Sequence, residues 1–212
     1  MSSMIDAIET QFAEAGRTPK GRQALRAIFR ATRDVMTEVG LPAASLDLIA
    51  QRANLTQAAV RHYFPTRDDL LMRFFLAGSE WLTRQLSRMV KAEHRSPGER
   101  LEKCLDWHLE FMEQVDTANW LEMSAFALRR KAERRVRTQW YRWLAGQYAV
   151  MIGEIQPSLG SAERKRRAHV ILTLVLGAWL THGRGSAFDS ATNPSLRRQQ
   201  LVAAAMGIAT QH

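Results

Sequence analysis

Two short helical segments joined by a tight turn, within residues 45–64, constrain the fold of this chain more than any other feature. Ser45 and Thr56 each precede an apolar-periodic run, where a hydroxyl group can cap the first turn of a helix. Pro65 lacks an amide hydrogen and ends the second segment. The pattern predicts a helix-turn-helix whose buried sides are Leu46, Ile49, Ala50 and Ala53 on the first helix and Val60, Tyr63 and Phe64 on the second.

The second of these helices leaves a narrow outer strip of small and hydrogen-bonding side chains. The strip consists of Gln57, Ala58, Arg61 and His62, at positions i, i+1, i+4 and i+5. A DNA major groove is wide enough to admit one helix, and such side chains can approach base edges there. A polar strip taken alone is more often a solvated helix face. Here the caps and the surrounding charge favour DNA contact.

The positive charge of the chain is concentrated around this motif. The 212 residues carry a net charge of +9, and the span 17–67 holds nine basic and three acidic residues, hence +6. Phosphate contact supplies most non-specific DNA affinity, so this asymmetry favours a nucleic-acid partner. A preceding helix, predicted over 19–39 and ended by Gly40, buries Leu25, Ile28, Phe29, Thr32, Val35, Met36 and Val39, and its other face carries Lys20, Arg22, Arg26, Arg30 and Arg33.

The rest of the chain has helical periodicity and no strand alternation, which predicts an all-α protein of roughly nine helices. Residues 1–16 are left open between a short amphipathic arm and a frayed terminus. A capping box is expected where Ser96, Pro97 and Glu99 open a helix. We predict an N-terminal arm and three-helix DNA-binding domain over residues 1–66, and a larger helical ligand-binding and dimerisation domain over residues 67–212.

Residues 21–71 resemble the DNA-binding domain of the tetracycline-repressor (TetR) family of bacterial regulators. The resemblance rests on the amphipathic first helix ending at Gly40, the Ile49-Ala50 pair, the turn at 53–56 and the run 60–70, VRHYFPTRDDL. Three positions depart from the usual pattern. Asn54 and Ala58 stand where Gly is common, although Asn also tolerates left-handed geometry. Arg61 stands where Tyr is common, which would change a neutral phosphate contact into a charged one.

The resemblance implies a set of DNA-facing residues and a ligand-responsive regulator. The DNA-facing side chains would be Thr56, Gln57, Ala58, Ala59, Arg61, His62, Tyr63 and Arg67, with Lys20 and Ser45 near the backbone. Residues 70–212 are similar in helix pattern to the family's ligand-binding and dimerising domain. Within them, residues 120–123, 177–180 and 187–189 distantly resemble the family's betaine-aldehyde-pathway regulators.

Two helices near the C-terminus predict a homodimer. The helix over about 161–182 is apolar on every side in its second half, so both of its faces need covering. The helix over about 194–210 is also apolar on one side, which suggests a four-helix bundle across a two-fold axis. Such a dimer would present two reading helices roughly 34 Å apart and would bind a palindromic operator. The alternative is a monomer in which both helices belong to the core.

The C-terminal region is rich in large or polarisable side chains, which suggests a pocket for a small effector between helices. Plain core packing is the other interpretation, and it accounts for about half of them by ordinary burial habits. The side chains are Trp107, His108, Phe111, Met112, Trp120, Met123, Phe126, Trp140, Trp143, Tyr148, Met151, Trp179 and His182; all except Phe126, Tyr148 and Met151 are the candidate pocket residues, with His108 and His182 as polar handles.

An enzyme is not expected. No histidine pairs with a carboxylate or cysteine at ligand spacing, and neither a phosphate loop nor a nucleophile elbow is present, so we predict no catalytic residues, no metal site and no cofactor. Cys104 on an apolar helical face is expected to be a small buried residue, with a redox sensor as the lesser alternative. The arginine-rich runs at 129–137 and 164–167 are expected to be solvated faces, and an anionic effector is the minority reading.

The apolar runs and the cysteine count also indicate where in the cell the protein is expected. The apolar run 170–180 is too short to cross a bilayer, and the N-terminus lacks the pattern of a secretion signal. One cysteine fits a reducing compartment, so a cytoplasmic protein without a membrane partner is expected. The rival to a DNA-binding regulator is an all-α adaptor that binds another protein.

Overall fold

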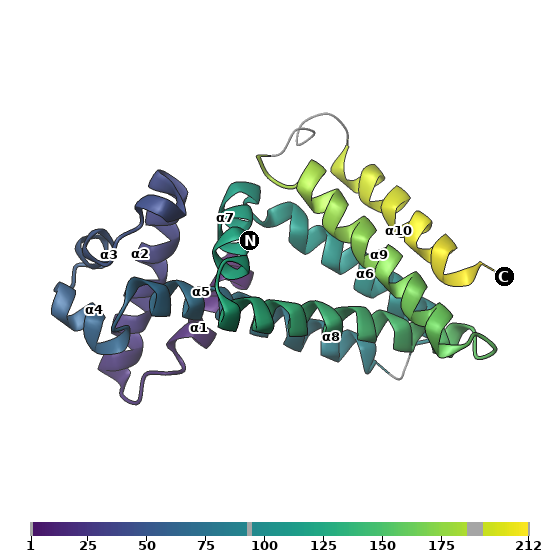
Figure 1. Ribbon diagram of the computed structural model, residues 1–212, viewed down its shortest axis with the longest axis horizontal. Coiled ribbons are helices and arrows are strands. Elements are labelled where there is room, and N and C mark those ends of the chain that lie inside the picture. Colours follow the sequence, from purple (N-terminus) through teal and green to yellow (C-terminus); the bar gives the residue numbers. More distant parts are fainter. Residues whose placement is uncertain (1, 93–94, 186–192, 212) are drawn as a thin grey trace. The chain divides into compact units, whose positions relative to one another are not determined.

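The regular secondary structure of the protein is helical (Figure 1). A computed structural model describes residues 2–92, 95–185 and 193–211, and these ranges contain ten helices besides one isolated β-bridge between Asp116 and Arg184. The helices are α1 (Ser2–Ala13), α2 (Pro19–Ala43), α3 (Leu46–Arg52), α4 (Gln57–Tyr63), α5 (Arg67–Val90), α6 (Pro97–Gln114), α7 (Thr117–Leu128), α8 (Lys131–Ile155), α9 (Ser161–His182) and α10 (Pro194–Thr210).

The all-α prediction is confirmed, and the additional helix is α1. The segment left open between an arm and a frayed terminus forms a helix because Phe12 finds a core to enter. Phe12 is fully buried, with ring centroids 5.4 Å from Phe29 and 5.6 Å from Phe64. Burying a phenylalanine side chain contributes about 1.5–3 kcal/mol, enough to order a short terminal helix.

The chain folds as two compact units. The N-terminal unit comprises Met1–Leu82 and Ala118–Arg134, and the C-terminal unit comprises Thr83–Thr117 and Arg135–His212. Helix α7 therefore packs with the helix-turn-helix, although it lies far along the sequence from it. The functional boundary between residues 66 and 67 remains a prediction, since these units describe packing alone.

Helix α2 is the spine of the N-terminal unit. The Thr18 hydroxyl accepts a hydrogen bond from the Gly21 amide at 3.1 Å, and Pro19 occupies the first turn, as the capping pattern predicts. The helix is interrupted at Gly40, whose φ of 76° lies in the left-handed region that favours glycine. The prediction that Val39 is buried is wrong: its side chain is 47% exposed, because the chain turns away from the core at Gly40.

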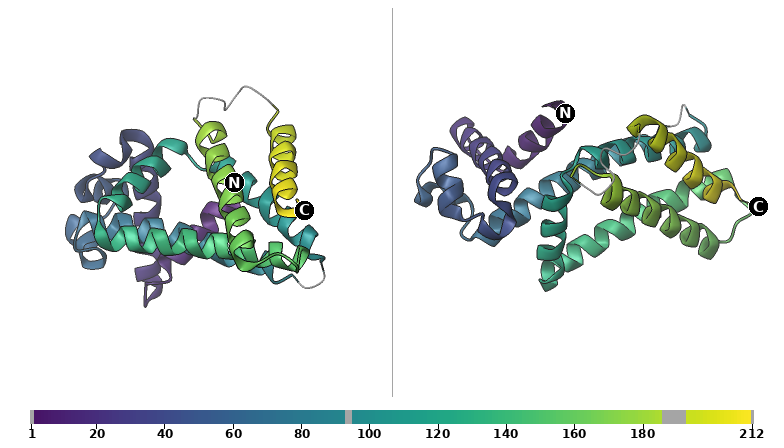
Figure 2. Two further views of the ribbon diagram at one scale, coloured as in Figure 1. Left: turned by 45° about the vertical axis from the view of Figure 1, so that its right-hand side comes forward. Right: turned by 90° about the horizontal axis from the view of Figure 1, so that it is seen from above.

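The C-terminal unit is built around α6, the larger part of α8, α9 and α10. Helices α9 and α10 lie side by side, and both pack on α6 (Figures 1 and 2). The predicted capping box opens α6: the Ser96 hydroxyl accepts from the Glu99 amide, and the Glu99 carboxylate accepts from the Ser96 amide at 2.8 Å. No helix within the described ranges is both long and apolar enough to traverse a lipid bilayer.

Candidate nucleic-acid interface

Helices α3 and α4 form the predicted helix-turn-helix, with a hydroxyl cap on each helix. The Ser45 Oγ accepts a hydrogen bond from the Leu48 amide at 3.1 Å, and the Thr56 Oγ1 accepts one from the Ala59 amide at 3.1 Å. Each cap satisfies a backbone donor that a helix start otherwise leaves free. Both helices are only seven residues long, so their orientation depends on these caps and on packing against the unit's core.

The turn between the two helices is made by a residue in left-handed geometry. Asn54 has a φ of 55°, and it is the only non-glycine residue of the described ranges with a positive φ. The Leu55 amide then donates to the Ala50 carbonyl at 3.0 Å, which closes the end of α3. The expectation that Asn can replace the glycine usual at this position is confirmed, because Asn enters this region at low cost.

Helix α4 is held by one buried face and presents the other to solvent. Val60 is fully buried and Phe64 is 7% exposed. The four strip residues Gln57, Ala58, Arg61 and His62 are exposed, and Ala59 and Tyr63 are half-buried. The side chains that the sequence pattern predicts to contact DNA, those of the strip, are therefore accessible to a ligand.

The remaining predicted DNA-facing residues surround this strip. Lys20, Ser45 and Thr56 are exposed. The Tyr63 ring packs edge-on against His62 with centroids 5.1 Å apart, and its hydroxyl lies close to Gly21 in the first turn of α2. Tyr63 thus ties the reading helix to the start of α2.

Arg67 fastens the corner between α2 and α3. Its Nε donates to the Ala44 carbonyl at 2.5 Å, and a second nitrogen donates to the Leu41 carbonyl. On the other side of the same corner, the Glu122 carboxylate of α7 accepts from the Leu41 amide at 2.5 Å. Sequence reasoning missed Glu122 because neither periodicity nor capping links positions 81 residues apart.

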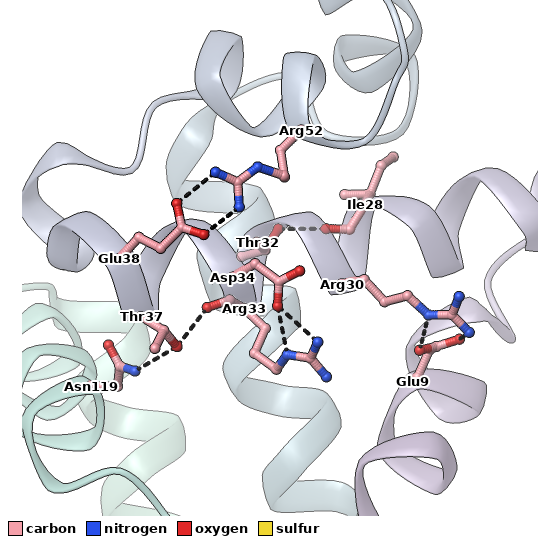
Figure 3. Close-up of polar contacts among 10 residues, drawn as sticks. All are labelled: Glu9, Ile28, Arg30, Thr32, Arg33, Asp34, Thr37, Glu38, Arg52 and Asn119. Atoms are coloured by element: carbon pink, nitrogen blue, oxygen red, sulfur yellow. Dashed lines mark hydrogen bonds and ion pairs between the residues drawn. The ribbon is translucent and has the colours of Figure 1, made fainter. Parts of the chain in front are cut away.

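Most of the basic face expected on α2 is neutralised inside the unit (Figure 3). Glu9 of α1 is 2% exposed and accepts from Arg30 at 2.7 and 2.9 Å, and Arg26 lies 3.5 Å from the same carboxylate. Hydrogen bonding to Glu9 raises the pKa of Arg30 above its ordinary value. Arg33 pairs with Asp34. These arginines are therefore less available to phosphates than their sequence positions indicate.

The cations left near α4 are few and define the charged edge of the interface. Arg52 pairs with Glu38 at 2.6 Å, a contact between α3 and α2 that lowers the pKa of Glu38 (Figure 3). Within the described ranges, Arg17, Lys20 and Arg61 are exposed and have no acidic partner. Because an unpaired cation is the one that releases counterions when it meets a phosphate, these three are the best-placed phosphate ligands around the strip.

The candidate effector residues are divided between the two units. Met123 belongs to the core of the N-terminal unit, and Trp120 packs against that core with its ring 5.5 Å from Phe75. The others lie in the C-terminal unit: Trp107, His108, Phe111, Met112, Trp140, Trp143, Trp179 and His182. Residues 187–189, part of the distant resemblance, lie outside the described residues.

His108 and Tyr148 form a buried polar pair within the C-terminal unit. His108 Nδ1 lies 2.6 Å from the Tyr148 hydroxyl, and both side chains are essentially inaccessible. Burial lowers the pKa of His108 to about 4 and raises the pKa of Tyr148 above its ordinary value. Among the described residues, His108 Nε2 has no hydrogen-bond partner. The pair is therefore uncharged near neutral pH and offers one unused hydrogen-bonding atom.

No group of three or more potential metal ligands occurs within the described part of the chain. Cys104 is buried one helical turn before His108, and burial raises the pKa of its thiol to about 12. A thiol in that state is a poor nucleophile. His108, Tyr148 and Cys104 are therefore suited to packing and hydrogen bonding.

Comparison with known proteins shows which families and structures this chain is similar to. The model of the bacterial regulatory proteins of the tetR family matches residues 28–73, the span from mid-α2 to the first turns of α5. A regulator of Serratia proteamaculans, the HTH-type transcriptional regulator BetI, is 29% identical over 188 residues, which cover 84% of this chain and 89% of the relative.

Solved structures share the fold over most of the chain. A TetR transcription regulator from Haloarcula marismortui has a TM-score of 0.71 at 22% identity and covers 88% of this chain and 96% of its own. A TetR-family regulator from Streptomyces coelicolor has a TM-score of 0.72 at 14% identity, with coverage of 92% and 91%. The helix-turn-helix is thus that of the tetR family of bacterial regulatory proteins, a non-enzymatic family, and most of the chain is similar to DNA-binding transcriptional regulators.

Proposed function

We propose that the protein binds a palindromic operator as a homodimer, represses transcription from it, and is released by a small effector. The observation that carries this proposal is the exposed strip of α4, held outward by the buried Val60 and by the caps at Ser45 and Thr56. A helix oriented in this way can enter a major groove with its polar side leading.

The strip residues take different roles in this proposal. Gln57 at the start of α4 reads a base edge, for which a side-chain amide is suited. Ala58 allows close approach because it is small. Arg61 and Lys20 contact phosphates, and Arg67 positions the α2–α3 corner through the carbonyls of Leu41 and Ala44. Contacts to phosphates fix register, and contacts to bases give sequence preference.

The dimer is supported by an exposed small and apolar face on α9 and α10. On α9, Val170 and Leu180 are each 48% exposed and flank the exposed Thr173 and Gly177 on one side of the helix. On α10, Leu196 is 54% exposed and is followed along the same side by Ala203 and Gly207. Because these two helices are adjacent, a second copy can cover both faces at once in a four-helix bundle.

The effector is proposed to bind among the aromatic residues of the C-terminal unit. The neutral His108–Tyr148 pair and its unused Nε2 atom support a ligand that forms a hydrogen bond there. Helix α5 begins directly after the helix-turn-helix and continues into the C-terminal unit, so a change in its tilt would alter the separation of the two reading heads. The coupling is a difference in effector affinity between two global states.

The proposal is tested by DNA binding under a salt titration. Wild-type protein is expected to retard a duplex from upstream of its own gene, and a specific metabolite is expected to abolish the shift. Arg61→Ala should weaken binding to every duplex and lower the salt slope by about one counterion per subunit, whereas Gln57→Ala should change sequence preference. Arg84→Ala, an exposed residue of α5 in the C-terminal unit, is the matched control.

Three results would each contradict a part of the proposal. A salt slope for Arg61→Ala equal to that of wild type and Arg84→Ala would remove the phosphate role of the strip. If wild-type protein retards no duplex even at low salt, the rival function as an all-α adaptor replaces the regulator. Equal separation of the reading heads in crystals with and without effector would eliminate the tilt of α5 as the coupling route.

A further inference from the structure

We infer that a second basic cluster, formed by Arg129, Lys131 and Arg134 where α7 meets α8, contacts the phosphate backbone of the same duplex. All three side chains are exposed, and none has an acidic partner within the described ranges. They belong to the N-terminal unit, together with the helix-turn-helix. This inference rests on the proposed DNA binding and adds a contact surface outside the helix-turn-helix.

The unpaired state of this cluster distinguishes it from most other arginines of the unit. Arg26 and Arg30 pair with Glu9, Arg33 with Asp34, Arg52 with Glu38, and Arg73 with Glu80. The unit therefore neutralises most of its guanidinium groups internally. The exposed cations left over in the described part of the unit fall into two sets, one beside α4 and one at the α7–α8 junction.

The junction is tied to the part of the fold that directly follows the reading helix. Arg130 stacks on the Phe126 ring with its guanidinium carbon 3.9 Å from the centroid, and it bonds to the carboxylate of Asp68. Asp68 lies in the first turn of α5, one residue after Arg67. The two neighbours of Arg130 in sequence, Arg129 and Lys131, are thus anchored beside the start of α5.

Lys131 and Arg134 extend this surface by one turn. Residues three apart lie on one side of a helix, and the Arg134 amide donates to the Arg130 carbonyl at 2.9 Å, so the chain is helical from the anchor onward. The one acid in the segment, Glu133, is half-buried. The side chains are exposed rather than gathered in a cavity, which suits the extended row of charges on a duplex better than a small enclosed anion.

The test removes three charges from this cluster and, as a control, three charges elsewhere. R129Q/K131Q/R134Q is compared with R84Q/R88Q/K91Q, whose residues are exposed on α5 and directly after its end in the C-terminal unit and likewise have no acidic partner in the described ranges. Both variants lose the same net charge. Lys131 and Arg134 lie in the first turn of α8, where a cation is unfavourable, and Arg129 follows the last turn of α7, where a cation is favourable, so the cluster variant should unfold close to the wild-type temperature.

The measurement is the affinity for a 40-base-pair mixed-sequence duplex and for the upstream duplex, by fluorescence anisotropy across a salt series. The cluster variant is expected to lose salt slope by about one for each phosphate contact removed, on both duplexes, while the control variant keeps the wild-type slope. Equal slopes for the two variants would overturn the inference. If inorganic pyrophosphate stabilises wild type but not the cluster variant, and the slopes are equal, the cluster binds a small anion instead.

The outcome also separates this inference from the proposed function. Should the cluster play no part, wild-type protein still binds duplex and Arg61→Ala still lowers the slope. Absence of binding by wild type itself would instead contradict the proposed function.

Discussion

His108 is the buried residue whose protonation state matters most for the stability of the C-terminal unit. Burial lowers its pKa from 6.5 to about 4. Between these two values the unfolded chain binds a proton that the folded chain excludes, so stability falls as pH drops from about 6.5 towards 4 and is independent of this group above that window. From pH 7.5 to pH 5 the expected loss is about 2 kcal/mol.

Urea denaturation at pH 7.5 and pH 5 measures this contribution. His108→Gln is the comparison, because glutamine cannot take up the proton and can still bond to the Tyr148 hydroxyl. Wild type should lose about 2 kcal/mol more than the variant between the two pH values. An identical loss for both proteins would show that His108 is already protonated in the native state or reaches solvent.

Cys104 should resist thiol reagents in the native protein. It is fully buried, and its pKa of about 12 leaves almost no thiolate at pH 8. A disulfide-based thiol reagent is expected to label it only after addition of denaturant, with the free thiol followed by absorbance. Labelling of native protein at the rate of a small-molecule thiol would instead support the redox sensor that sequence analysis left as an alternative.

At the residue scale, the sequence predicted local geometry well and long-range partners poorly. The caps at Thr18, Ser45 and Thr56 and the left-handed Asn54 follow from each residue's own chemistry and neighbours, and all are observed. The pairing of Arg30 with Glu9 joins positions 21 residues apart, so no local sequence pattern predicts it. The basic face of α2 was therefore expected to be more available than it is.

At the scale of elements, α7 fastens the corner between α2 and α3. Glu122→Ala should leave the Leu41 amide, which belongs to a buried residue, without its acceptor, at a cost of about 1–3 kcal/mol. Because this corner orients α3 and α4, affinity for duplex should fall as well.

Glu122→Gln supplies the control for this contact, since its amide oxygen can still accept the hydrogen bond. Thermal unfolding and duplex anisotropy should place the Gln variant between wild type and Ala. A Gln variant as impaired as Ala would mean that the negative charge, rather than the hydrogen bond, carries the effect.

The helices themselves were largely predictable, with two instructive differences. Proline, glycine and capping residues mark the boundaries of α2, α4 and α6, and the structure places those boundaries accordingly. The order of α1 depends on Phe12 reaching Phe29 and Phe64, and the exposure of Val39 depends on the turn at Gly40. Both are tertiary effects that periodicity does not contain.

At the scale of the whole molecule, the dimer proposed through α9 and α10 makes a clear prediction. Val170→Glu with Leu180→Glu would put four carboxylates into the proposed bundle, and burying unpaired charges is strongly unfavourable. Both side chains are about half exposed in the single chain, so the monomer should still fold. Light scattering after size exclusion is expected to report the monomer mass, with operator affinity much reduced.

Val150→Glu is the matched control for the dimer. Val150 is 52% exposed and lies on α8, away in sequence from the proposed face. This variant should remain dimeric. A dimeric double variant, or a monomeric wild type, would contradict the proposed assembly.

Assignment of aromatic residues to one pocket was the least predictable part of the molecule. Trp120 and Met123 share the periodicity and composition of their neighbours along the chain, yet they pack in the N-terminal unit. Which of two cores a helix joins depends on the complementarity of whole surfaces, and a single sequence carries no direct signal of it.

The burial of Glu9 beneath Arg26 and Arg30 has a practical consequence for handling this protein. A chain that lacks its first thirteen residues, or in which a fused tag displaces α1, would lose the Glu9 carboxylate and expose the guanidinium groups of Arg26 and Arg30. It would also expose the apolar surface on which Phe12 packs. Such a preparation would gain affinity for any polyanion while becoming prone to self-association, and its apparent operator specificity would understate that of the native molecule.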